Sequence, residues 1–409
     1  AIRDYDEAIR LDSKHAIAFN NRGAAWESKG NFDRALKDFD DALRLDPALA
    51  PALIVRGLLK MRKGDREGAL KDLDNALAID PGSAKALTNR GLVYQEKGEL
   101  DRALVDLDQA VRLDSGFAPA FGNRGRVWSA KGDHDRAVAD FDQALKLDPK
   151  LAVVFANRGA AWKSRSNLEL AIKDYDEAVR LDSRNAAFLA NRGDLWQEKG
   201  DFARAIKDYD EALRLDPRRV AALAGRAAAR KEKGDYESAI KDFDAALRLD
   251  PMDASLRFDR AIALLLARKP GAAAGFKSAL EAGGYRDDHA CFAVILGHLS
   301  ARIAGDKPAA ARFLEESRGK LEEKWPYPVV RHLRDEIDAA ALLKLAVDQE
   351  KQTETRCYLG LLEMAENRRA AALAHFRWVK EKGAKDFVEH QIAVSELARL
   401  ESSSARVGN

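Results

Sequence analysis

The sequence has few of the features that would indicate a secreted, membrane-spanning or nucleic-acid-binding protein. Its 409 residues include two cysteines, Cys291 and Cys357, too few for a disulfide framework, which favours a reducing cytoplasm without excluding the periplasm. The longest apolar run, 261–267, is far shorter than the roughly 20 residues that span a bilayer. A net charge of +2 gives no electrostatic case for binding nucleic acid or an acidic membrane.

Motifs for catalysis or for holding a metal are also missing. The sequence has no glycine-rich phosphate loop, zinc-ligand spacing or nucleophile elbow. Cys291 and His298, with His289 just before them, are fewer than the four ligands of a structural zinc site. We therefore expect a protein that is not an enzyme and that has no metal or cofactor.

What the sequence does contain is a strict period of 34 residues. The period is marked by a glycine that follows an arginine at Gly23, Gly57, Gly91, Gly125, Gly159 and Gly193, and by an alanine in the same place at Ala227 and Ala261. A period of this length, kept without insertion over seven copies, predicts a stacked array of repeats rather than one globular core.

Each copy has the pattern of two antiparallel helices. In the copy at 16–49, Phe19, Gly23 and Trp26 lie on one helix face by their i, i+4, i+7 spacing. Gly30 can end that helix because a left-handed residue costs least as glycine. The second helix carries its own small–aromatic–small stripe and ends at an Asp-Pro pair. Neither helix can bury its stripe alone, so neighbouring copies must stack.

This pattern over residues 1–253 resembles the tetratricopeptide repeat. The resemblance implies an all-α, right-handed superhelix of about ten helix pairs, with the first helices lining a concave face that binds proteins. We expect the second helix of a truncated repeat at 1–15, seven regular repeats at 16–253, two divergent pairs at 254–323, an inserted turn and helix at 324–352, a last pair at 353–386, and a capping helix with a tail at 387–409.

The C-terminal quarter carries a second resemblance. Its segments 325–326, 356–360 and 387–390 are similar to the C-terminal part of bacterial NlpI-like repeat proteins. This similarity implies a bacterial source.

An arginine and an aspartate recur in every copy. Arg22 flanks the buried stripe of a first helix and Asp38 that of the following second helix, and both recur at intervals of 34 residues. We predict a series of arginine–aspartate pairs along the seam between the helices. A basic stripe for phosphate is the rival interpretation, and it fails because an aspartate accompanies every arginine.

The positions that face the concave side in this family vary most between copies. They predict a partner-binding groove lined by Ile17, Asn20, Ile54, Leu58, Met61, Arg62, Thr88, Leu92, Gln95 and Arg126. Ile54, Leu58 and Met61 form an apolar patch that either binds a ligand or is covered by the superhelix or a second chain. Because Asn20 and Ile54 stand where some family members have a carboxylate-clamping lysine, we expect an internal peptide segment or a folded partner.

The resulting hypothesis is a protein-interaction scaffold that binds an extended peptide or a partner protein in the concave groove. One alternative is a regulatory or docking region of a larger protein with an upstream catalytic domain, because the sequence starts within a repeat. Another is self-association: Phe19 and Trp26 beneath Tyr5 are predicted to be only half covered, which would favour a homodimer through the N-terminal end.

Overall fold

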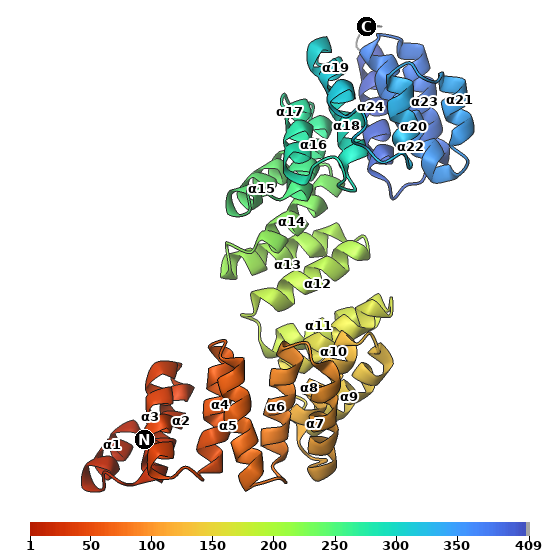
Figure 1. The fold of residues 1–409 in the computed structure, drawn as a ribbon. Helices are drawn as coiled ribbons and strands as arrows, with labels where there is room; N and C mark the ends of the chain where they lie inside the picture. The colour runs from red at the N-terminus through yellow and green to blue at the C-terminus, as the bar shows by residue number, and fades with distance from the viewer. Residues whose placement is uncertain (406–409) are drawn as a thin grey trace. The chain divides into compact units, whose positions relative to one another are not determined.

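The computed structural model describes residues 1–405, and over this range the regular structure is α-helix, labelled α1 to α24 in Figure 1. The expected all-α fold is confirmed. The chain divides into two compact units, residues 1–195 and residues 196–409, and the division falls inside α12 (Ala186–Glu198). Among the described helices, none combines the length and apolarity needed to cross a bilayer.

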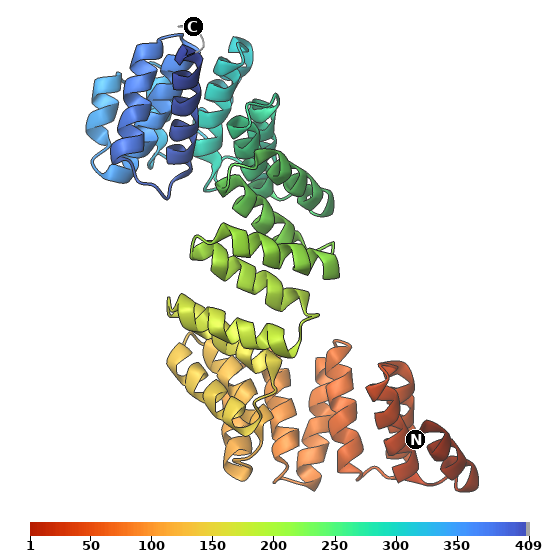
Figure 2. The same cartoon turned by 180° about the vertical axis from the view of Figure 1, so that it is seen from behind.

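Unit 1 is a series of helix pairs that follow the 34-residue period (Figure 2). A single helix, α1 (Ile2–Leu11), precedes the pairs. The pairs are α2 (Ala16–Ser28) with α3 (Phe32–Leu45), α4 (Ala50–Arg62) with α5 (Arg66–Ile79), α6 (Ala84–Glu96) with α7 (Leu100–Leu113), α8 (Ala118–Ala130) with α9 (His134–Leu147), and α10 (Ala152–Ser164) with α11 (Leu168–Leu181).

The two helices of a pair approach closely at the repeated glycine. A Cβ atom added to Gly23 would lie 3.1 Å from the ring of Phe39 and 3.3 Å from the carbonyl oxygen of Ala35. The turn between the helices needs a left-handed residue, and Gly30 takes it with φ of 74°. In the copy at 152–185 a serine, Ser166, takes the same conformation with φ of 57°. Local geometry therefore stays constant where the sequence departs.

Unit 1 bends toward its first helices. Consecutive first helices contact one another, α2 with α4, α4 with α6, α6 with α8 and α8 with α10, and these contacts are more extensive than any between consecutive second helices. Because the first helices are closer together, they lie on the inside of the bend. The prediction that first helices form the concave face holds within unit 1.

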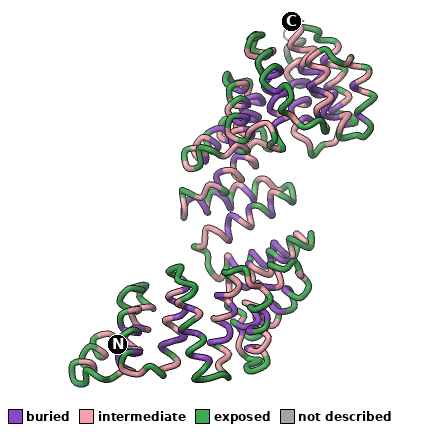
Figure 3. Tube along the Cα trace, viewed as in Figure 1, coloured by how far each residue is buried: buried purple, intermediate pink, exposed green. Residues whose placement is uncertain are grey.

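Burial follows the repeat rather than a single centre. Figure 3 shows buried stretches in each helix pair, alternating with exposed ones. Phe39 and Phe141 are fully buried at the same position of their copies, and each belongs to an apolar cluster shared with the neighbouring copy. Neighbouring copies thus complete each other's core, as a stacked array requires.

Unit 2 continues with pairs and then departs from them. Its helices are α13 (Phe202–Leu215), α14 (Val220–Glu232), α15 (Tyr236–Leu249), α16 (Ala254–Leu266), α17 (Ala272–Gly283), α18 (Ala290–Ile303), α19 (Lys307–Glu316), α20 (Tyr327–Leu333), α21 (Ala339–Leu345), α22 (Gln349–Ala365), α23 (Arg369–Lys382) and α24 (Val388–Ala405). The segment 324–352 contains two short helices, α20 and α21, where one was expected. Helix α18 contacts α22 directly, so the stack of first helices continues past this insertion.

Candidate functional site

The arginine of each regular copy is held by two aspartates. Arg124 donates to Asp140 from Nε and Nη2 at 2.8 and 2.7 Å, and from Nη1 to Asp108 of the preceding copy at 2.8 Å. The same pattern joins Arg22 to Asp38 and Asp6, Arg56 to Asp72 and Asp40, Arg90 to Asp106 and Asp74, Arg158 to Asp174 and Asp142, and Arg226 to Asp242 and Asp210.

This arginine ladder confirms the predicted pairing and has a structural role. The hydrogen bonds from Asp140 raise the pKa of Arg124 above its ordinary value. Each arginine links the second helix of its own copy to the second helix of the copy before. Because its donors are occupied, the ladder offers no free cations for a ligand.

Three of the predicted groove residues are not available to a partner. Ile54, Met61 and Thr88 are only 7%, 6% and 2% exposed, because adjacent copies pack over them. Met61, for example, lies in an apolar cluster with Leu73 and Val93. The patch proposed at Ile54 and Met61 is therefore covered by the array itself, which was the alternative interpretation.

Five other predicted residues remain accessible to different degrees. Ile17 is 54% exposed, Arg62 is exposed, and Asn20, Leu58 and Leu92 are partly buried. The guanidinium of Arg62 lies 3.8 Å from Glu27. Leu58 and Leu92 occupy the same position of consecutive first helices, α4 and α6, so they form the start of a row across the concave face.

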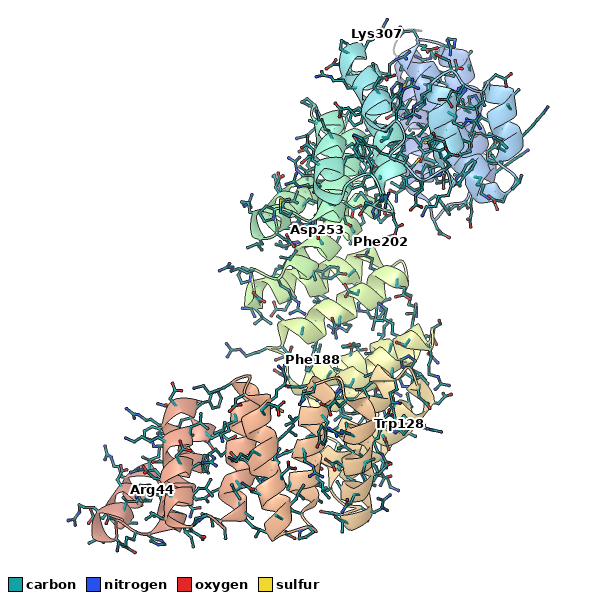
Figure 4. All side chains as sticks on the ribbon, viewed as in Figure 1. Arg44, Trp128, Phe188, Phe202, Asp253 and Lys307 are labelled. Carbon is teal, nitrogen blue, oxygen red and sulfur yellow. The ribbon has the colours of Figure 1, made fainter. Side chains whose placement is uncertain are left out.

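The last two predicted residues, Gln95 and Arg126, line one hollow in the next part of this face. The hollow has a volume of about 330 Å³ and lies among α6, α8, α9 and α10. Its lining consists of Gln95, Arg126, Ser129, Ala130, His134, Phe141, Asn157, Ala160, Ala161 and Ser164. Figure 4 labels Trp128, which lies on α8 between Arg126 and the end of that helix. The volume is at the lower end of the range, from roughly 300 Å³, of pockets that hold small ligands.

Arg126 differs from the ladder arginine two residues before it. Its one hydrogen bond runs from Nη1 to Asn123 Oδ1 of the same helix turn and is long, at 3.4 Å. Among the described residues no carboxylate forms an ion pair with Arg126. Burial lowers the pKa of Arg126, and the charge of Glu96 opposes that shift. Glu96 itself lies 3.5 Å from Arg66. Arg126 is thus a partly buried cation with donors to spare.

Further polar atoms around the hollow lack partners. Gln95 Oε1, Ser129 Oγ and His134 Nδ1 are buried, and none has a hydrogen-bond partner among the described residues. Buried polar atoms are normally paired, so a group of three beside an unpaired cation points to a missing ligand group or to water. The hollow is the strongest candidate site in unit 1.

Sequence reasoning found part of this site and missed the rest. It named Gln95 and Arg126 as groove residues, and the structure brings them together. His134 was missed because it belongs to a second helix, where no groove position was sought. The available signal was that small residues, Ala130 and Ala160, surround an arginine that occurs once at its repeat position.

The cysteine and histidine considered as ligands have structural surroundings. Burial raises the pKa of Cys291 to about 12, so its thiol stays protonated. His298 is buried, its Nδ1 lies 3.0 Å from the carbonyl oxygen of Ala310, and burial lowers its pKa. Within residues 1–405 no three metal-ligating side chains converge.

Family models of the tetratricopeptide repeat match six segments of the chain: 16–49, 57–98, 84–117, 118–151, 186–219 and 228–266. These segments are tetratricopeptide repeats. Tetratricopeptide repeat proteins are in general non-enzymatic scaffolds for protein interactions, and their stacked helices present extended concave surfaces. The similarity of the C-terminal quarter to bacterial NlpI-like proteins stays a prediction.

Solved tetratricopeptide structures agree with the fold. The Cut9–Hcn1 hetero-tetramer of the APC/C is 18% identical with a TM-score of 0.53, covering 71% of this chain and 58% of that one. PilF of Pseudomonas aeruginosa is 24% identical, covers 50% and 93%, and has a TM-score of 0.47. YrrB, a TPR protein described as having an unusual peptide-binding site, is 26% identical, covers 45% and 94%, and has a TM-score of 0.35. No curated protein matches the sequence.

Proposed function

We propose that this chain is a protein-interaction scaffold that binds an extended peptide segment of a partner across the first helices of unit 1. The observation that carries the proposal is the hollow at Arg126, where a cation without an ion pair meets buried polar atoms without partners. The arginine ladder and the interlocked cores hold these first helices in place before binding. A preformed surface loses little conformational entropy when a ligand docks.

A pair of matched substitutions tests which face binds. Leu58→Glu places a charge on the concave row, while Val105→Glu places the same charge on α7, a second helix, where Val105 is 65% exposed. We expect a partner captured by the unmodified protein to be lost with Leu58→Glu and kept with Val105→Glu. Equal capture by both variants would show that the concave face of unit 1 is the wrong surface.

Self-association through the N-terminal helix is a second candidate function. The expectation that Phe19 is half covered is wrong, because Phe19 is 8% exposed. However, α1 has no buried residue, and Leu11 and Ile17 beside it are 73% and 54% exposed. Light scattering of the full chain tests this candidate: a monomer at all concentrations rejects it, and a dimer should dissociate with Leu11→Glu.

A further inference from the structure

The chemistry around Arg126 narrows the kind of ligand. Arg126 is the one cation that lines the hollow, apart from any proton on His134, and the nearby Glu96 adds a negative charge. The guanidinium fork matches the two oxygens of a carboxylate. A phosphate with nearly two negative charges would need a second cation, and Glu96 would repel it. A single carboxylate therefore suits the site best.

The position of the hollow indicates that the carboxylate belongs to a side chain within a peptide. First helices continue on both sides of α8, with α6 before it and α10 after it, and α8 contacts both. A bound segment can therefore extend in both directions from Arg126. A chain terminus is not required at this place, and the lysine of the terminal-carboxylate clamp is absent from Asn20 and Ile54.

The row beside Arg126 adds a spacing. Leu58, Leu92 and Arg126 hold the same repeat position on α4, α6 and α8, which contact in that order. Packed helices lie roughly 8–10 Å apart, and an extended chain advances about 3.3 Å per residue. Side chains about three residues apart in an extended peptide would thus meet successive members of the row.

We infer that unit 1 recognises an internal aspartate or glutamate of an extended segment, seated in the hollow at Arg126, with apolar side chains about three and six residues away that contact Leu92 and Leu58. Ser129 can donate to the second carboxylate oxygen, and the Gln95 amide can bond the peptide backbone. This inference rests on the proposed function, because it specifies the ligand of the same surface.

The test is a double-mutant cycle on peptides. The probe is a library of extended peptides with blocked termini, each carrying one central glutamate and randomised flanks. For the binders selected with the full chain, we expect Glu→Gln in the peptide to weaken binding roughly tenfold to a hundredfold. The same change should have little effect with the Arg126→Gln protein, because the charged partner is gone. Arg126→Glu should restore binding to peptides with a central lysine.

Controls separate the site from general electrostatics. Arg62→Gln removes an equal charge from an exposed residue at the end of α4 and should leave the Glu→Gln effect unchanged. Ala160→Met should fill the hollow and weaken the glutamate peptides without removing charge. Circular dichroism should show that each variant keeps the helix content of the unmodified chain.

The outcomes distinguish this inference from the proposed function. If no library peptide binds, both fail. If peptides bind but Glu→Gln changes nothing, or if Arg126→Gln keeps the full Glu→Gln effect, the inference fails and the proposed function stands. Tighter binding of a central phosphoserine, or of a free C-terminus in place of the glutamate, would replace the internal carboxylate by another anion and overturn the assignment.

Discussion

The regular copies of unit 1 and the last helices of unit 2 hold their buried acids in opposite ways. In unit 1 an aspartate such as Asp140, whose side chain is 9% exposed, receives two hydrogen bonds from an arginine. In unit 2, Glu389 on α24 is 2% exposed and accepts from the Tyr358 hydroxyl at 2.5 Å. Glu354 on α22 is 4% exposed and accepts from Trp325 Nε1 at 2.7 Å. Both of these donors are neutral.

The difference teaches how repetition and singularity use charge. A repeated ion pair keeps both partners ionised, and every added copy extends the ladder. A buried carboxylate with a neutral donor keeps much of its desolvation cost, and burial raises the pKa of both Glu354 and Glu389. Such groups make the end of the array sensitive to pH, whereas the ladder is not expected to respond near neutrality.

The largest expected effect compares two arginines on one helix. Arg124→Ala leaves Asp140 buried without its bidentate partner and should lower the free energy of unfolding by roughly 3 kcal/mol. Arg126→Ala, two residues later, breaks no ion pair and should change it by less than about 0.5 kcal/mol. Urea unfolding followed by circular dichroism measures both. Similar losses would show that Arg126 supports the array, which would weaken its assignment as a ligand residue.

The second prediction concerns pH and the end of unit 2. The pKa of Glu354 is raised to about 7 in the folded chain, mainly by burial and then by Glu389, from an ordinary value of 4.5. The folded state therefore holds a proton that the unfolded state releases between these values. Local stability should fall by about 2 kcal/mol as the pH rises from about 4.5 to about 7, and level off above that.

Hydrogen exchange in α22 as a function of pH checks this slope. Glu354→Gln stays neutral and can still accept from Trp325, so it should remove much of the slope and raise protection at high pH. Glu67→Gln, at an exposed position of unit 1, is the control and should leave α22 unchanged. An unaltered slope in Glu354→Gln would assign the pH dependence to other groups, such as Glu389.

The third prediction compares the helix–helix contact in the two regions. A Cβ atom on Gly23 would fit tightly against Phe39 at 3.1 Å, but one on Gly360 would overlap the ring of Phe376, which is fully buried. Alanine gains about 1 kcal/mol of helix propensity over glycine. Gly23→Ala should therefore be nearly neutral, as Ala227 at this position suggests, while Gly360→Ala should cost about 1–2 kcal/mol from overpacking. Thermal unfolding of the two variants checks the contrast.

How much of the molecule was predictable follows the same division. The helix pairs, their glycine turns and the ladder could be predicted because each is repeated, so a pattern such as Arg124 with Asp140 is seen many times in one sequence. The hollow at Arg126 could be predicted only in part, because it depends on small residues from neighbouring copies. The pairing of Glu389 with Tyr358 and the second short helix of 324–352 occur once, and a single occurrence leaves no pattern.

The smallest expected effect tests the left-handed turn in both regions. Ser166 has φ of 57° where other copies have glycine, as in Gly200 with φ of 78°. A side chain in this conformation costs roughly 1 kcal/mol, so Ser166→Gly should stabilise the chain by up to that amount and Gly200→Ser should destabilise it similarly.

Arg268, in unit 2, has the same conformation with φ of 56°, but it donates from Nε to Glu396 Oε1 at 3.1 Å. The Glu396 side chain is 3% exposed, so removing its partner leaves a buried carboxylate with Arg399 alone. Relief of backbone strain and loss of the ion pair therefore act in opposite directions. We expect Arg268→Gly to destabilise the chain although Ser166→Gly stabilises it, and urea unfolding of both variants measures the sign. A gain in both would mean that the buried carboxylate at Glu396 is held well enough by Arg399, and that the strain at Arg268 serves no purpose in unit 2.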